Sequence, residues 1–417
     1  MRTIRSILTA LALLIISNGL LFAQGGSNYS TFGFGDIRLS VGAAYEGMGS
    51  TYYGITSPYL VNTANPASWS FVQTTRVQAG YRFNQNKISS STASTSQNNG
   101  KLDGATVLFS IDTGMAISGC IGLYPSSSIN YSFTKPISFI SEGTTVTGTT
   151  SYSGTGGLVT AIFGGSTRVM DGLYVGLAGL YHFGNISDLI ESRLDDESFN
   201  TALNLNQDKF NGFGLRTGLL YQPTSQLTIG ASFTTSASLS YIRLLRYDEA
   251  NAFGQLVDTS STYSEHTTSL PSILGLGASY LSGKFLIAAD AEFQNFGTTN
   301  YRMNLPLSIE YTNASRFSVG VSRRGTSGAG VSYGDRIGIN FGAGMKSLYY
   351  KVNGENINEY YGSFGLQLPF GGAAMVDASV TAGIRGTTNN NLLSEKFIRC
   401  SFSMSVGEIW FVPFKRD

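Results

Sequence analysis

The stretch LTIGASFTTSASLSY, residues 227–241, alternates between apolar and small polar side chains over its whole length. Successive side chains of a β-strand point to opposite faces, so the stretch predicts a strand with one apolar and one polar face. Strands in soluble sandwiches run about five to six residues, whereas a strand that crosses a bilayer needs about 9 to 11. The length therefore indicates a membrane strand. The predicted faces are Leu227, Ile229 and Phe233 toward lipid and Ser232, Ser236 and Ser238 toward a lumen.

The composition agrees with a membrane β-barrel. Charged residues make up 13% of the chain, against about 25% in soluble domains, and 51 of the 417 residues are glycine. No internal stretch reaches the roughly 18 uninterrupted apolar residues of a membrane helix, so the chain must span with strands. The formal net charge is +1, and nothing in the charge pattern indicates nucleic-acid binding.

The N-terminus is typical of a secretory signal peptide. Arg2 and Arg5 precede the apolar run ILTALALLIISNGLLFA, and Ala23 is a plausible last residue before cleavage. We therefore expect residues 1–23 to be a signal peptide, with a membrane anchor as the alternative.

The same alternation recurs from residue 70 onward and predicts fourteen strands. Several connections are very short, such as DTG, MDG and SG, and others are long and polar. Short periplasmic turns opposite long extracellular loops are typical of barrels in the outer membrane of Gram-negative bacteria. The predicted strands of this all-β antiparallel barrel, residues 70–417, are 70–84, 101–112, 115–133, 152–168, 172–185, 210–222, 227–243, 268–281, 284–297, 314–324, 335–349, 357–368, 374–387 and 396–410.

Eleven charged or histidine side chains within these strands fall on the polar parity. An Arg or Lys on the lipid face near the bilayer midplane would cost about 2 to 4 kcal/mol, so a closed barrel requires this placement. The residues predicted to face the lumen are Arg76, Arg82, Asp112, His182, Arg216, Asp290, Glu292, Lys346, Asp377, Arg385 and Arg399.

Residues 24–69 are rich in glycine and aromatic residues and do not alternate long enough to span a membrane. Disordered segments are poor in aromatic residues, so we prefer a packed plug, or hatch, inside the lumen to a disordered leader.

Two motifs resemble the FadL-type transporters, outer-membrane carriers of long-chain fatty acids and other hydrophobic compounds. In NTANPASW, Asn65, Pro66 and Ala67 match the Asn-Pro-Ala motif that precedes the first strand in that family. The stretch GLYPSSSINYSF lies in the third strand, where the family has an inward kink that opens the wall. The resemblance implies a hatch, a lateral opening at Pro125, Ser126, Ser127 and Ser128, and passive passage of hydrophobic molecules or lipids into the membrane. Pro125 is a physical reason for the kink, because proline cannot donate to the strand ladder.

Two other functions remain open from the sequence. The C-terminal WFVPFKRD and the YPSSSINYSF stretch also resemble the PorV-type barrels of type IX secretion, which implies secretion-machinery proteins as partners. A general porin is the other alternative, although a hatch is unfavourable for an open pore. Fold alone does not decide between them.

The sequence does not predict an enzyme, a metal site or a cofactor. We expect His182 to be a hydrogen-bonded lumen residue and His266 to lie in a long loop, and no G-x-S-x-G nucleophile motif is present. Cys120 and Cys400 lie far apart in strand-like runs, and together with two histidines they offer no metal-ligand spacing.

Overall fold

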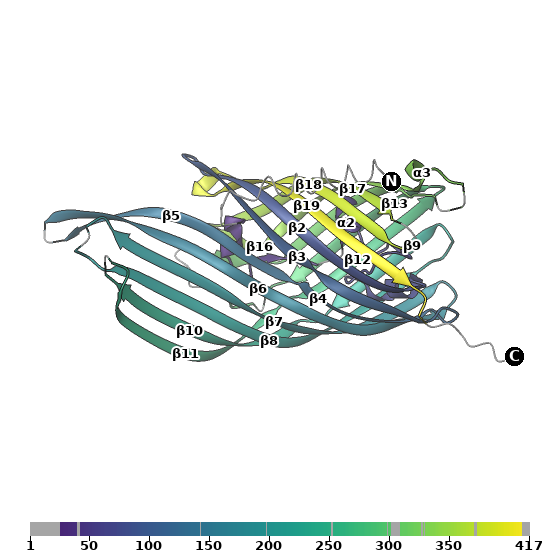
Figure 1. Cartoon of the computed structure of the whole chain (residues 1–417), viewed down its shortest axis with the longest axis horizontal. Helices are drawn as coiled ribbons and strands as arrows, with labels where there is room; N and C mark the ends of the chain where they lie inside the picture. Colours follow the sequence, from purple (N-terminus) through teal and green to yellow (C-terminus); the bar gives the residue numbers. More distant parts are fainter. Residues whose placement is uncertain are drawn as a thin grey trace.

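The protein is a closed antiparallel β-barrel in a computed structural model (Figure 1). The structure describes residues 26–39, 42–141, 143–196, 198–251, 253–297, 299–301, 309–326, 328, 330–370 and 373–410. The predicted signal peptide lies outside these residues. Within them, fourteen wall positions form one ring, and the last strand pairs with the first to close it. The predicted fourteen-stranded antiparallel β-barrel is therefore confirmed.

Four of the fourteen wall positions are divided by a break into two strands. The wall consists of β2 (Thr75–Ser89), β3 (Ser94–Asp112), β4 (Ile117–Pro125) with β5 (Ser127–Ser141), β6 (Thr144–Met170), β7 (Leu173–Leu194), β8 (Thr201–Tyr221), β9 (Leu227–Thr234) with β10 (Ala237–Ala250), β11 (Leu256–Leu270) with β12 (Ser272–Ser282), β13 (Phe285–Asn295), β14 (Ile309–Tyr311) with β15 (Ala314–Arg323), β16 (Gly338–Val352), β17 (Glu355–Pro369), β18 (Met375–Gly386) and β19 (Ser394–Glu408).

Helices are few and short. They are η1 (Asn28–Thr31), α2 (Ala43–Gly47), η2 (Pro66–Phe71), α3 (Tyr333–Arg336) and η3 (Asn389–Asn391). No helix in the described ranges is long and apolar enough to cross a bilayer.

Several segments predicted as long polar loops are strands. Residues 244–267, for example, belong to the hairpin of β10 and β11, and His266 lies on β11 instead of in a loop. The strand β6 has 27 residues, far more than the roughly 9 to 11 that cross a bilayer. The long hairpins therefore project beyond the membrane at the end opposite the short turns (Figure 1). The first wall strand begins at Thr75, not at residue 70, because η2 occupies residues 66–71.

The outward face of the wall is apolar. On β9, Ile229 and Phe233 are 47% and 45% exposed, while Ser232 is 4% exposed. The charged residues predicted to face the lumen are mostly buried, and Arg216 on β8 is 3% exposed. Outward apolar and inward polar side chains match a barrel with lipid outside.

A β-bulge reverses this parity in the seventh wall position, which corrects the prediction for Ser236 and Ser238. Four residues of this strand lie between the pairs Leu239 with Gly212 and Arg216 with Thr234, opposite three residues of β8. One extra residue moves every later side chain to the opposite face. Ser236 and Ser238 are consequently exposed, and Leu239 is fully buried in the lumen.

We expect Phe233→Arg to destabilise the barrel by about 2 to 4 kcal/mol if the side chain lies near the bilayer midplane, and by less toward the interface. Urea unfolding in lipid vesicles measures the change. Phe233→Leu is the matched control, because it keeps an apolar group at the same position. Equal midpoints for the two variants would contradict the lipid-facing assignment.

The described part of the N-terminal segment, residues 26–72, lies inside the barrel. It carries η1, the two-residue strand β1 (Asp36–Ile37), α2 and η2. Phe34, Tyr45 and Trp69 are 0%, 1% and 0% exposed, and each belongs to a cluster that includes wall residues. The lumen is thus filled by protein along much of its length.

Candidate functional site: the filled lumen and its lateral seam

The Asn-Pro-Ala motif fixes the end of the N-terminal segment to the wall. The Asn65 side chain accepts a hydrogen bond from the Ala67 backbone N–H at 3.2 Å and caps η2, where Pro66 occupies the first position. Its amide donates to the carbonyls of Tyr53 at 2.8 Å and Leu219 at 3.2 Å. The motif therefore joins one hatch turn to another hatch loop and to β8.

Glycine on the wall permits this close approach. A Cβ added to Gly218 on β8 would lie 2.2 Å from Asn65 Oδ1, and one added to Gly176 on β7 would lie 2.4 Å from the Pro66 carbonyl carbon. Trp69 follows on η2 and donates its indole N–H to the Asn62 carbonyl at 2.7 Å. Phe71 packs in a tilted arrangement against Tyr174, which lies beside a short turn, with ring centroids 4.3 Å apart. This end of the hatch is therefore at the short-turn end of the barrel.

Arginines from the wall hold the middle of the hatch. Arg316 on β15 pairs with Glu292 on β13 at 3.0 Å and donates to the Tyr52 hydroxyl at 2.6 Å and to the Ser50 carbonyl at 2.5 Å. Asp290 on β13 accepts from the backbone N–H of Tyr52 at 2.6 Å. A buried charge is strongly destabilising unless it is paired and hydrogen-bonded. Any shift of the hatch would leave Arg316 and Asp290 without these hatch partners, so the contacts favour one position of the hatch.

A second arginine holds the start of the hatch. Arg385 on β18 donates to Glu359 on β17 at 2.6 and 2.8 Å, to Asp36 on β1 at 2.8 Å and to the Ser27 hydroxyl at 2.9 Å. Glu395 on β19, 4.0 Å from Arg385, accepts from the Ser27 hydroxyl at 2.6 Å. The group combines residues more than 350 positions apart in the chain.

The other predicted lumen residues lie around the wall and do not form one site. Arg82 pairs with Glu46 of α2, and Arg76 donates to the Ser405 hydroxyl at 2.8 Å. Arg216 donates to the Thr63 carbonyl at 2.5 Å. His182 bonds to Thr160 at 2.8 Å through its Nδ1. Arg76, Arg82 and Arg216 each contact the hatch directly.

Three charged residues that line the central lumen, Arg316, Glu359 and Arg38, are not among those predicted from the sequence. Arg316 and Glu359 lie inside predicted strands on the lumen parity, so the rule that found Glu292 could have found them. Arg38 lies in the hatch, whose residues do not alternate between apolar and polar, so no sequence pattern predicts its position in the lumen. No group of three or more His, Cys, Asp or Glu side chains that could hold a metal ion occurs within the described ranges.

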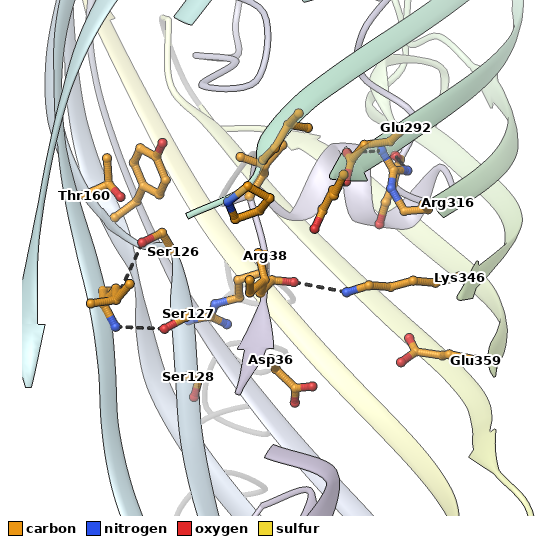
Figure 2. Close-up of a pocket in the computed structure, with 18 of the residues that line it drawn as sticks. Asp36, Arg38, Ser126, Ser127, Ser128, Thr160, Glu292, Arg316, Lys346 and Glu359 are labelled. Carbon is orange, nitrogen blue, oxygen red and sulfur yellow. Dashed lines mark hydrogen bonds and ion pairs between the residues drawn. The ribbon is translucent and has the colours of Figure 1, made fainter. Parts of the chain in front are cut away.

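A cavity of about 180 Å³, lined by both charged and apolar side chains, remains at the centre of the lumen. Figure 2 shows Ser126, Ser127 and Ser128 on one side of it, Lys346 and Glu359 on the other, and Arg38 of the hatch between them. Arg38 is 3.5 Å from Asp103, and its Nε and Nη2 have no hydrogen-bond partner among the described residues. Two donors on a buried guanidinium are thus available to an anionic or polar group in the cavity.

The wall is interrupted beside this cavity. The third wall position breaks at Ser126, and three residues there oppose two residues of β6, which carries Gly157 at φ 134°. One extra residue on one strand of an antiparallel pair forms a β-bulge, which bends that strand. The break therefore arises from this extra residue as well as from Pro125.

Beyond the break, the neighbouring strands separate. β3 pairs with β4 only over residues 105–112, so residues 94–104 have no wall strand on that side among the described residues. Figure 1 shows β5 diverging from β2 and β3 toward the long hairpins. We call this gap between residues 94–104 of β3 and β5 the lateral seam.

The hatch and two side chains bridge the lateral seam. The hatch strand β1 pairs with residues 127 and 128 of β5, and the Gly26 N–H donates to the Asn130 carbonyl at 2.8 Å. Lys101 on β3 donates to the Ser128 hydroxyl at 2.9 Å, and Gln97 donates to the Ser132 carbonyl at 2.6 Å. These contacts can therefore break without disrupting the hydrogen bonds that join neighbouring strands of the wall.

An apolar cluster lies above the cavity, toward the long hairpins. It combines hatch Phe34 with side chains of β5, β6, β7, β8, β10 and β11 and with Tyr301. Ile129 of the cluster follows the break directly, so the apolar part of the lumen reaches the lateral seam. The other buried members are Tyr131, Leu158, Ile186, Phe210, Ala237, Leu239, Tyr241 and Leu270.

Comparison with known proteins gives similar folds. A family model described as BamG matches residues 3–417. A Pseudomonas aeruginosa FadL homologue has a TM-score of 0.62 at 10% identity, covering 90% of this chain and 99% of that chain. The Pseudomonas putida toluene transporter TodX has a TM-score of 0.58 at 15% identity, covering 89% and 99%. The Ralstonia pickettii toluene transporter TbuX has a TM-score of 0.58 at 14% identity, covering 88% and 98%. No curated protein matches by sequence.

Proposed function

The chain belongs to the BamG family, and because its barrel has the FadL-type outer-membrane fold, we propose that it lets hydrophobic small molecules, such as long-chain fatty acids, cross the outer membrane passively. The observation that carries the proposal is the lateral seam between β3 and β5, next to an apolar cluster and a cavity. A solute would enter between the long hairpins and follow the apolar cluster downward.

Exit through the lateral seam follows from solvation. Burial of each CH₂ group contributes about 0.8 kcal/mol, so an apolar chain prefers the bilayer to an aqueous lumen. A carboxylate on such a chain would be held by the two free donors of Arg38, which lies beside Ser126. Release requires β1 and Lys101 to move away from β5. The proposed gate is therefore the set of contacts that bridge the seam.

Reversible closure of the lateral seam tests the proposal. Gln97→Cys with Ser132→Cys, in a Cys120→Ser, Cys400→Ser background, places one thiol on each side. A bis-methanethiosulfonate cross-linker forms a disulfide with each cysteine and releases methanesulfinate. It is expected to abolish uptake of labelled palmitate into whole cells, and a reductant that cleaves both disulfides is expected to restore it. The matched control joins Thr134→Cys to Ser151→Cys, whose strands already pair and whose side chains lie 3.1 Å apart. Unchanged uptake after cross-linking would exclude the seam as the exit.

A second candidate is a partner or shuttle of a secretion system. It is favoured by apolar side chains on the projecting hairpins, among them Ile140, Phe253 and Tyr263 at 77%, 89% and 69% exposure. Large exposed apolar groups outside the membrane are typical of protein-interaction surfaces. On this alternative, cells with and without the chain take up equal amounts of palmitate. The filled lumen is unfavourable for the general-porin alternative.

A further inference from the structure

A second cavity lies at the short-turn end of the barrel, against the wall from β13 to β18. It has a volume of about 430 Å³ and lies between this wall, α2 and the hatch loop of residues 55–60. The lateral seam lies in a different part of the wall, between β3 and β5. The cavity is therefore separate from the route proposed above.

The floor of this cavity is apolar. Five side chains line it, each at most 5% exposed: Tyr45, Met48, Ile55, Leu60 and Leu286. All five belong to one buried cluster, so the floor is a fixed part of the packing between hatch and wall. Cavities of about 300 to 1,000 Å³ with apolar walls and a few polar groups are typical small-molecule sites.

The rim of the cavity is cationic. Arg324 and Arg336 line it, and no Asp or Glu does so among the described residues. Arg324 makes one side-chain hydrogen bond, to the Thr56 carbonyl at 3.4 Å, and has no carboxylate partner within the described ranges. Burial lowers the pKa of the Arg324 guanidinium, and the Tyr45 hydroxyl opposes this shift.

A buried polar atom on the same rim also lacks a partner. Thr326 Oγ1 is buried without a hydrogen bond to any described residue. An unsatisfied hydroxyl costs about 1 to 3 kcal/mol, which a ligand oxygen would recover. The adjacent Arg323 differs, because it pairs with Asp335 at 3.4 Å and does not line the cavity.

We propose that this cavity binds a single-chain anionic amphiphile, with the acyl chain on the floor and the carboxylate or phosphate between Arg324, Arg336 and Thr326. Arg324 recognises the anion as a charge-assisted donor, and the fork of a guanidinium suits both headgroups. A bound chain would also contact the hatch loop of residues 55–60 from the short-turn side.

Photolabelling of the full chain in lipid nanodiscs tests the proposal, with a palmitic acid that carries a diazirine on its chain. We expect cross-links on Met48, Ile55, Leu60 or Leu286. Arg324→Gln should weaken labelling at these residues about tenfold, the order expected when a hydrogen bond to a charged group is lost. Arg323→Gln is the matched control and should label like the native chain. Ala374→Trp fills the half-buried cavity edge and should abolish the labelling without removing a charge.

Competitors identify the headgroup. Unlabelled palmitate and lysophosphatidic acid should both compete, and the stronger one distinguishes a carboxylate from a phosphate source. Hexadecanol competing as well as palmitate would overturn the anionic assignment. Cross-links only on lipid-facing residues such as Phe233, or equal labelling of Arg324→Gln and Arg323→Gln, would overturn the site. Heat-modifiable mobility on gels verifies that each variant is folded. The readout is binding, so it stands apart from palmitate uptake.

Discussion

Arg385→Met is expected to lower the free energy of unfolding by about 3 to 5 kcal/mol, the range for removing one partner of a buried ion pair. Arg385 is 5% exposed and contacts Glu359, Asp36 and Ser27, with Glu395 at 4.0 Å. Without it, Glu359 and Glu395 remain buried at 3% and 1% exposure with no guanidinium between them. The start of the hatch loses its ionic attachment at the same time.

Thermal unfolding followed by gel mobility measures the stability change, and limited proteolysis reports whether residues 26–37 become accessible. Arg246→Met is the control, because Arg246 pairs with Asp248 at 2.9 Å on the surface and is 42% exposed. Exposed pairs contribute at most about 1 kcal/mol. Adding Glu359→Gln to Arg385→Met should recover part of the loss. A native melting temperature for Arg385→Met would show that the hatch is held by packing alone.

Deletion of residues 24–69 is expected to convert the closed barrel into a channel for polar solutes. The inward wall carries many polar side chains, and three of its ion pairs are internal to the wall: Arg316 with Glu292, Arg385 with Glu359, and Arg82 with Asp103, although Arg82 loses its closer partner Glu46 in the deletion. These charges stay paired when the hatch is absent and become solvated. The barrel should therefore stay folded while its lumen fills with water.

Single-channel current in planar bilayers measures the opening, and sensitivity of cells to large hydrophilic antibiotics reports it in vivo. Asn65→Ala serves as the control, since it loosens one attachment and leaves the segment in place. A folded deletion variant with no added conductance would mean that the long hairpins, not the hatch, close the barrel.

The wall could be predicted from the sequence because alternation is a local property. All fourteen wall positions overlap a predicted strand, and the short turns lie where they were expected. The strand ends toward the long hairpins could not be predicted in this way. Residues 244–267 project out of the bilayer, so neither face needs to be apolar, and the period-two signal disappears.

The bulge after Thr234 shows a different limit. The apolar residues continue at odd positions through Ala237 and Leu239, so the sequence carries no break in its pattern. The apolar odd-numbered residues up to Phe233 face lipid. Beyond the bulge, the apolar odd-numbered residues face the apolar part of the lumen around Phe34. Only the pairing with β8 reveals the extra residue.

The alternation of strand faces predicts which wall residues point into the lumen, but it does not predict which residues of the hatch they contact. Parity places Ser232 in the lumen, yet it cannot show that its hydroxyl donates to the Ala64 carbonyl at 2.8 Å. Likewise, Glu46 meets Arg82 and Ser401 through long-range packing of the hatch. The hatch has no regular periodicity and its partners on the wall are distant in sequence, so no local sequence pattern predicts these contacts.

The attachment of the hatch to β18 and β19 also constrains the order of assembly. Ser27 contacts Glu395 across 368 positions, and β19 closes the ring by pairing with β2, which directly follows the hatch. Ser27 and Asp36, at the start of the hatch, thus acquire their partners Arg385 and Glu395 only when the last strands arrive. Such distant contacts make folding slow. The growing wall must keep its ends apart until residues 26–72 have entered, so insertion into the membrane and packing of the interior finish together.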